Sequence, residues 1–182
     1  MNTKSFWPNH KFAAITIAVL LTGAISLYGL WLSGFRVNLT PSLPLGVYRL
    51  SGEAARKGGL AAFCLDVSNP FSRAARERGY LASGACPSGL RPLLKTVAGL
   101  PGDHVKITPE ALLVNGEALA NSARLERDQF GREVPPSLLI TGRIPAGFAL
   151  VVSQEHAGSF DSRYFGLVPM SSLKTVKPVL LF

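Results

Sequence analysis

Serine and lysine side chains are the groups of this 182-residue chain that could supply nucleophilic catalysis. Only two histidines, His104 and His156, follow residue 36, which gives little support to a Ser-His-Asp triad or a histidine metal site. Lys95 differs from the other lysines because it lies in the apolar segment 92–98, PLLKTVA. Its amine is either exposed at a sheet edge, as the composition of the segment favours, or buried with a pKa lowered by desolvation. A buried amine of that kind is a competent general base for a serine nucleophile.

The elements that position such residues begin with an apolar N-terminal segment. Residues 12–32 form a run of 21 without a charge, which as a helix covers the roughly 30 Å hydrocarbon core of a bilayer. A cleaved signal peptide is the alternative, but the run is longer than the usual apolar core and no small-x-small cleavage site follows it. We therefore predict a transmembrane anchor at 12–32, preceded by a cytoplasmic tail at 1–11.

The flanking charges orient this anchor. Lys4 and Lys11 precede it, whereas Arg36 alone lies close to its other end. The positive-inside rule then places the N-terminus in the cytoplasm and a domain of residues 37–182 on the outer side.

Two cysteines fall in this outer domain. Cys64 and Cys86 lie in what is predicted to be an oxidising compartment, where we expect a disulfide between them. It would close a loop of about 23 residues and stabilise the fold by roughly 3 kcal/mol. A pair of free buried thiols is the alternative, and two cysteines are too few for a four-cysteine zinc site.

The net charge of +8 raises the question of a nucleic-acid partner. Of the 19 basic residues, 16 follow Arg36 together with all 11 acidic ones, which leaves the outer domain with +5. A domain with this charge beside anionic lipid is expected to face headgroups, so no nucleic-acid partner is predicted. The one tight basic group, Arg73, Arg76 and Arg78, fits the solvated face of a helix.

Short strands between turns predict a mainly β outer domain. The candidate strands are 37–39, 47–50, 59–65, 93–98, 104–108, 111–114, 149–153 and 175–181. Asn115-Gly116 between apolar runs is a strong hairpin signal.

One helix is predicted between the two cysteines. Asn69 is its N-cap, Pro70 its first residue and Gly79 its terminator. The domain thus contains a small helical insertion that the disulfide would close. Residues 119–142 lack a regular pattern and predict a long excursion, which in a compact domain is often functional.

Three segments of the outer domain resemble successive boxes of the signal peptidase superfamily. They are 38–48 (NLTPSLPLGVY), 95–105 (KTVAGLPGDHV) and 159–168 (SFDSRYFGLV). The first box, with a threonine two residues before its serine and Pro-x-Gly-x-Tyr after it, resembles the TraF branch of conjugative-transfer peptidases. Any one box is weak, but the three in family order behind an N-terminal anchor are specific. The resemblance implies a signal-peptidase-like β fold.

By this resemblance Ser42 is the nucleophile and Lys95 its general base. A serine hydroxyl needs a base to take its proton, and an amine does so at neutral pH only if burial holds it uncharged. Pro41 has no N–H, so the candidate oxyanion donors are the Ser42 amide and the Thr40 hydroxyl.

The third box supplies candidate supporting residues. Ser162 matches the serine that the resemblance implies will hydrogen-bond the lysine amine. Asp161 matches an aspartate implicated in activity in the conjugative branch, but it could equally form a structural ion pair with Arg163. Turn residues of the second box are expected to serve the fold: Gly99, Pro101, Gly102 and Asp103.

We therefore expect a membrane-anchored serine endopeptidase at the periplasmic face of the bacterial inner membrane, without metal or cofactor. The resemblance implies that it acts in conjugative transfer, a type IV secretion process, on a membrane-inserted pilin precursor. Water, or the substrate's own amino terminus, would resolve the acyl-enzyme, and the latter gives a cyclic pilin. Two alternatives remain: a general type I signal peptidase acting on many preproteins, and a non-catalytic assembly module of a secretion apparatus.

Overall fold

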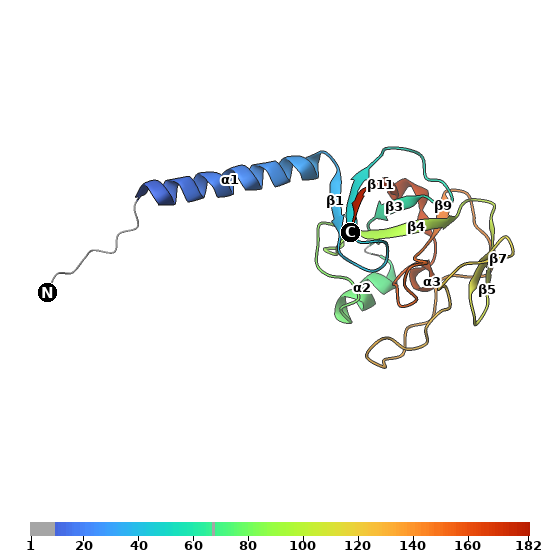
Figure 1. Ribbon diagram of the computed structural model, residues 1–182. Coiled ribbons are helices and arrows are strands. Elements are labelled where there is room, and N and C mark those ends of the chain that lie inside the picture. The colour runs from blue at the N-terminus through green and yellow to red at the C-terminus, as the bar shows by residue number, and fades with distance from the viewer. Residues whose placement is uncertain (1–9, 67) are drawn as a thin grey trace. The chain divides into compact units, whose positions relative to one another are not determined.

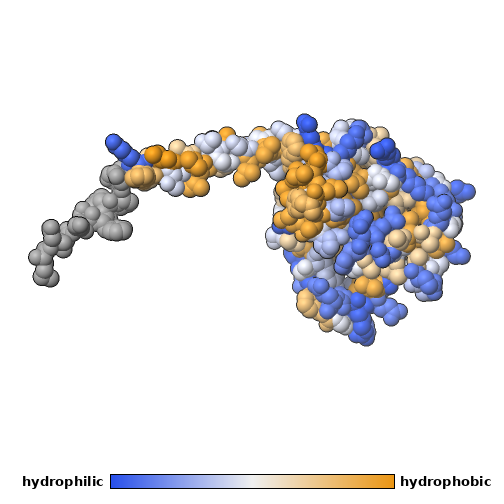
Figure 2. Space-filling view, viewed as in Figure 1, coloured by the Kyte–Doolittle hydropathy of each residue, from blue (hydrophilic) through white to orange (hydrophobic). Residues whose placement is uncertain are grey.

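The computed structural model describes residues 10–66 and 68–182 and divides the chain into two compact units. The first unit ends at Arg36 and contains helix α1 (His10–Leu32) (Figure 1). By length and composition Lys11–Leu32 could cross a membrane, although a signal sequence would pass the same test. Its surface is mainly hydrophobic (Figure 2).

Three hydroxyl side chains of α1 bond within the helix. The hydroxyls of Thr16, Thr22 and Ser26 each donate to the carbonyl oxygen one turn earlier. A polar group that is satisfied in this way can enter hydrocarbon without an unpaired donor.

The second unit, Val37–Phe182, is built on two sheets, and strand β1 of the larger sheet begins two residues before this unit, at Phe35. The seven-stranded sheet has the order β1-β2-β11-β3-β4-β9-β10, and the four-stranded sheet has the order β7-β6-β5-β8. The strands of the larger sheet are β1 (Phe35–Asn38), β2 (Gly46–Leu50), β3 (Leu60–Phe63), β4 (Leu93–Gly99), β9 (Phe148–Val152), β10 (Val168–Pro169) and β11 (Lys174–Leu181). Those of the smaller sheet are β5 (His104–Ile107), β6 (Leu112–Val114), β7 (Glu117–Ala118) and β8 (Gly142–Arg143).

The eight predicted strands are confirmed, with ends that differ by a few residues. The prediction missed β7, β8 and β10, because strands of two residues are too short to show an alternating pattern. The predicted hairpin joins β6 to β7, where Asn115 and Gly116 have φ values of 53° and 88°. Positive φ at both positions is what a two-residue type I′ turn requires.

The predicted helical insertion is also confirmed. Helix α2 (Pro70–Glu77) begins where the Asn69 side chain accepts a hydrogen bond from the Phe71 N–H. Cys64 and Cys86 form the predicted disulfide around it. Figure 1 shows α2 and α3 (Ser162–Phe165) on the same side of β4, and a 3₁₀ turn, η1 (Met170–Ser172), precedes β11.

Strands β4 and β9 lie between two hydrophobic cores. One core contains Val97 and Val151, and the other contains Leu150 and Val152. Because successive side chains of a strand point to opposite faces, β9 is buried on both of its faces. On β4 the side chain of residue 95 shares a face with Val97, so it points toward the first core.

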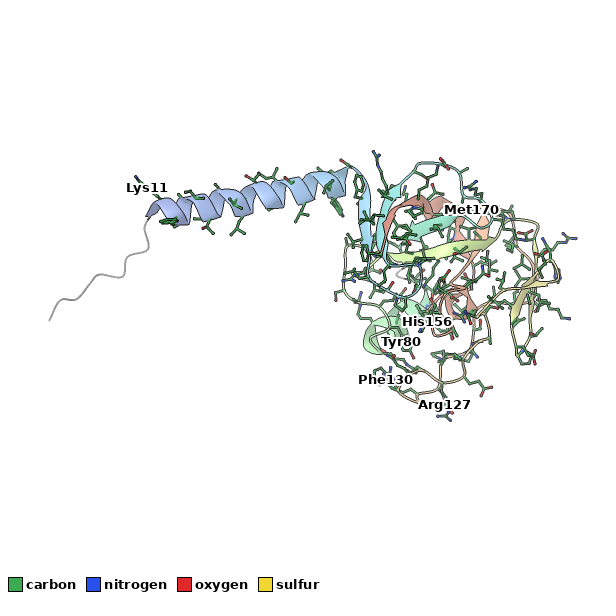
Figure 3. All side chains as sticks on the ribbon, viewed as in Figure 1. Lys11, Tyr80, Arg127, Phe130, His156 and Met170 are labelled. Atoms are coloured by element: carbon green, nitrogen blue, oxygen red, sulfur yellow. A yellow bond between two sulfur atoms is a disulfide. The ribbon has the colours of Figure 1, made fainter. Side chains whose placement is uncertain are left out.

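The predicted excursion, residues 119–142, is anchored on the helical insertion. The Tyr80 hydroxyl donates to Asp128 at 2.7 Å, and the same carboxylate pairs with Arg132 at 2.7 Å. Figure 3 labels Tyr80 together with Arg127 and Phe130 from the excursion.

Candidate active site

Lys95 is buried on an interior strand of the larger sheet. β4 pairs with β3 on one side and β9 on the other, and the lysine is 2% exposed. The sheet-edge interpretation is therefore wrong. Burial lowers the pKa of the amine from 10.5 to about 8; the nearby Asp161 carboxylate opposes this change and the Arg163 guanidinium adds to it.

Ser42 lies in the turn between β1 and β2 and is half-buried, so solvent reaches it. Asn38, at the end of β1, holds this turn with its buried side chain. The Asn38 Nδ2 group donates to three carbonyl oxygens at 3.0 to 3.1 Å, those of Thr40, Leu43 and Pro44. Tyr48 closes the turn from β2, because its hydroxyl donates to the Pro44 carbonyl at 2.6 Å. The Asn and Tyr of the first box therefore shape the backbone around the serine.

Ser159 connects the lysine to this turn. Its Oγ accepts a hydrogen bond from Lys95 Nζ at 2.5 Å and lies 3.3 Å from Ser42 Oγ. The resemblance implied that Ser162 bonds the amine, but Ser162 Oγ instead accepts the Val151 N–H at 3.0 Å. The first residue of α3 turns its side chain back to β9, whereas the residue three positions earlier faces the amine. The serine that opens the third box was the available signal, and it was overlooked.

Asp161 and Arg163 form a fully buried ion pair. The Arg163 Nε and Nη2 groups donate to the two oxygens of Asp161, each at 2.8 Å. Asp161 also caps α3 by accepting the Arg163 N–H. Among the described residues, the hydrogen bonds of the Asp161 carboxylate come from Arg163 and from the Ser153 N–H, and none comes from Ser42 or Lys95. Of the two predicted roles, the geometry favours the structural ion pair.

Arg163 uses its remaining donors on backbone carbonyls. Its guanidinium donates at 2.8 to 3.0 Å to the carbonyl oxygens of Asn121, Ala123, Ala157 and Ser159. This side chain therefore fixes both the excursion and the loop that carries Ser159.

Thr40 is exposed, and its hydroxyl donates to Asn38 Oδ1 at 2.8 Å. It would have to rotate to face an oxyanion, so its predicted role stays a prediction.

The second box begins on β4 with Lys95 and continues into the turn between β4 and β5. The Asp103 carboxylate accepts the Leu100 N–H at 2.9 Å, and Gly102 has a φ of 92°. A side chain at Gly99 would place its Cβ 2.6 Å from Ile144 Cδ1. Pro101 lies within this turn, so the residues of the box that follow β4 serve the fold, whereas Lys95 at its start lies in the site.

Histidines do not contribute to the site. His104 and His156 are exposed, and His156 is labelled in Figure 3. Within residues 10–66 and 68–182, no group of three His, Cys, Asp or Glu side chains is arranged to hold a metal ion.

The fold and the site define a mainly β protein in which a desolvated lysine amine lies behind a serine that solvent can reach. The family described as signal peptidase, peptidase S26, matches residues 9–180. The chain belongs to this peptidase family.

Two relatives cover nearly the whole chain. The plasmid transfer protein TraF of Escherichia coli is 38% identical over 173 residues, which is 93% of this chain and 94% of the relative. The conjugal transfer protein TraF of Agrobacterium fabrum is 37% identical over 169 residues, which is 91% and 93% of the two chains. A crystal structure of a signal peptidase I from Enterococcus faecalis aligns with 70% of this chain and 99% of its own, with 23% identity and a TM-score of 0.39.

Proposed function

We propose that this chain is a membrane-anchored serine endopeptidase in which Ser42 is the nucleophile and Lys95 is the general base. The observation that carries the proposal is the line of three side chains from the buried amine, through Ser159, to the accessible Ser42 hydroxyl. A serine becomes nucleophilic when a base accepts its proton, and desolvation makes this amine able to do so near neutral pH.

The first half of the reaction forms an ester. In the neutral form of Lys95 the bond to Ser159 is reversed, so that the Ser159 hydroxyl donates to Nζ. Ser42 Oγ then attacks the scissile carbonyl carbon, and its proton passes to Ser159 as Ser159 gives its own proton to Lys95 Nζ. When the C–N bond breaks, the leaving amine takes a proton back along the same path. The Ser42 N–H and, after rotation, the Thr40 hydroxyl are the proposed donors to the oxyanion.

The second half releases the acyl group. A water molecule, or the amino terminus of the substrate, loses a proton along the same path and attacks the ester carbon. The Ser42 Oγ–C bond then breaks and the serine regains its proton. Water gives hydrolysis, and the amine gives a new amide bond and a cyclic product.

The proposed substrate is a membrane-inserted pilin precursor of a conjugative transfer system. The relatives named for plasmid and conjugal transfer support this choice, because they match over more than nine-tenths of both chains. Helix α1 supports an anchor that holds the enzyme beside such a substrate. The disulfide supports an oxidising compartment, hence a catalytic domain in the periplasm and an inner-membrane location.

The test is to co-express a candidate pilin precursor with this chain and to measure the mass of the pilin. Loss of a C-terminal peptide shows cleavage, and a further loss of one water shows cyclisation. We expect Ser42→Ala and Lys95→Ala each to abolish processing. Lys95→Arg should also fail, because an arginine cannot be deprotonated in a protein.

Two results would decide against the proposal. Processing by both alanine variants would mean that the domain is a non-catalytic assembly module. Rescue of a strain depleted of its signal peptidase would instead favour a general type I signal peptidase.

A further inference from the structure

A buried hydrogen bond holds the backbone of Ser42. The Ser153 Oγ donates to the Ser42 carbonyl oxygen at 2.7 Å. Ser153 is 0% exposed and follows directly after β9. Burying a serine is costly unless its hydroxyl and its backbone N–H have partners, and here both groups donate hydrogen bonds.

The backbone of Ser153 is fixed by the buried ion pair. Its N–H donates to Asp161 Oδ2 at 3.0 Å, and Arg163, the partner of that aspartate, donates to the Ser159 carbonyl at 2.9 Å. The same ion pair thus holds Ser153, which bonds the backbone of Ser42, and Ser159, which lies beside the side chain of Ser42. A displacement of Ser153 or of Ser159 would therefore alter the position of Ser42, the proposed nucleophile.

Through Ser153, Ser42 is also connected to β4, the strand that carries Lys95. Val152 is the register partner of Thr96, which is the neighbour of Lys95 on β4. Most hydrogen bonds of the Ser42 turn are local, since Asn38 bonds within the turn itself. The Ser153 hydroxyl reaches this turn from the part of the sheet that carries the lysine.

From this geometry we propose that Ser153 is a positioning residue, which holds Ser42 at reacting distance from Ser159 and Lys95. The inference rests on the proposed function. A displacement of about 1 Å in a reacting group can cost about a hundredfold in rate, so one hydrogen bond to the nucleophile's backbone is enough to matter.

The experiment uses the full chain in detergent with an acetyl-Ala-Ala p-nitrophenyl ester as the probe. We expect Ser153→Ala to lower kcat about 10- to 100-fold while KM changes less than about twofold. The pH dependence of kcat/KM should keep its midpoint, because the surroundings of Lys95 are unchanged. Ser153→Thr, which restores the hydroxyl, should recover most of the lost rate.

Ser72→Ala is the matched control. Ser72 is also buried, and its hydroxyl also donates to a backbone carbonyl, that of Asp66, but it lies on α2. Its loss should lower the melting temperature by an amount similar to that for Ser153→Ala and leave kcat within about twofold.

The outcomes separate the two levels of inference. If Ser42→Ala still turns over the ester, the proposed function fails. If Ser42→Ala is inactive but Ser153→Ala matches Ser72→Ala in kcat, the positioning role is wrong and the proposed function stands. If Ser153→Ala does not fold, Ser153→Cys takes its place, because a thiol has a similar volume but is only a weak hydrogen-bond donor. A kcat for Ser153→Cys equal to that of the unaltered chain would overturn the positioning role.

Discussion

At the scale of single residues, Lys95 controls the proposed chemistry through its protonation state. Burial is the main cause of its lowered pKa of about 8, and the two charges of the Asp161–Arg163 pair act on it in opposite directions. The amine accepts a proton only in its neutral form, so activity should follow the neutral fraction.

The first prediction is a pH profile. We expect kcat/KM for the ester probe to rise about tenfold per pH unit below a midpoint near 8 and to level off above it. The sign follows from the base: at lower pH the amine already holds the proton that it must accept. A profile without this rise, or one with its midpoint at the pKa of a solvated lysine, would contradict the role of Lys95.

The second prediction concerns stability. The pKa of Lys95 is lower in the folded chain than in the unfolded one, so at neutral pH the amine is still protonated when it is buried. Burying this positive charge lowers the free energy of unfolding. Stability should therefore rise as the pH increases from about 8 to 10.5, where the unfolded chain binds more protons. Lys95→Met should raise the free energy of unfolding at pH 7 by about 1 to 3 kcal/mol while abolishing activity.

Denaturant unfolding at two pH values measures this effect. The gain from Lys95→Met should shrink toward zero above the pKa of an unfolded lysine, because the unaltered side chain is then neutral in both states. Lys57→Met is the control, since Lys57 lies at the surface and its side chain is 42% exposed. A gain for Lys95→Met that is the same at both pH values would show that lost charge is not its cause.

The sequence predicted individual residues unevenly. Lys95 stood out because a charge within an apolar run needs a physical reason, although its burial could not be told from an edge position. Which of Ser159 and Ser162 contacts the amine depends on the direction in which a short helix turns its side chains. The order of residues within one motif does not reveal that direction. The hydrogen bond from Ser153 to Ser42 joins residues 111 apart in the chain, so no local sequence pattern could predict it.

At the scale of elements, the helical insertion supports the loop of Ser159. Phe160, the next residue, packs against two rings from within the disulfide-closed loop and against a ring from α3. Its ring centroid lies 6.2 Å from that of Phe71, 5.7 Å from that of Tyr80 and 5.9 Å from that of Tyr164. The insertion therefore supports the residue next to Ser159 without contributing a group to the proposed site.

The third prediction follows from this packing. Replacing both Cys64 and Cys86 by alanine should lower stability by roughly 3 kcal/mol, the cost of freeing the loop in the unfolded chain. It should also lower kcat at temperatures where the protein is folded, because Phe160 then has a less rigid support. Steady-state kinetics below the melting transition measures the effect. Reductant should slow the unaltered chain and leave the double variant unchanged; a fully active double variant would show that the insertion serves stability alone.

Regular elements were the most predictable part of this fold. β4 and β9 are apolar runs with turn residues at their ends, and α2 has a complete cap in its sequence. The excursion at 119–142 could be predicted only as irregular, because its structure depends on partners elsewhere. Arg163 binds two of its carbonyls, and Tyr80 binds its Asp128.

At the scale of the whole molecule, the described residues form an apolar helix and a domain with its own cores. The chemistry of the proposed site lies entirely in the second unit. The helix would contribute by keeping enzyme and membrane-inserted substrate in the same bilayer, which raises their effective concentration without a new contact. The two contributions can be measured separately. The second unit determines the rate at which a bound ester reacts, whereas the helix determines how often the chain meets a membrane-inserted substrate.

The fourth prediction uses this separation. A chain that begins at residue 33 retains β1 and both cores, so it should hydrolyse the ester probe with a kcat within about twofold of the full chain. It should leave the membrane fraction and process a membrane-inserted pilin precursor far more slowly. Mass spectrometry of the full chain should find residues 1–32 still attached, and a phosphatase fused after residue 182 should be active in the periplasm. A mature chain that has lost its first 32 residues yet processes the precursor at full rate would identify the helix as a cleaved signal sequence, and the anchor would then play no part in catalysis.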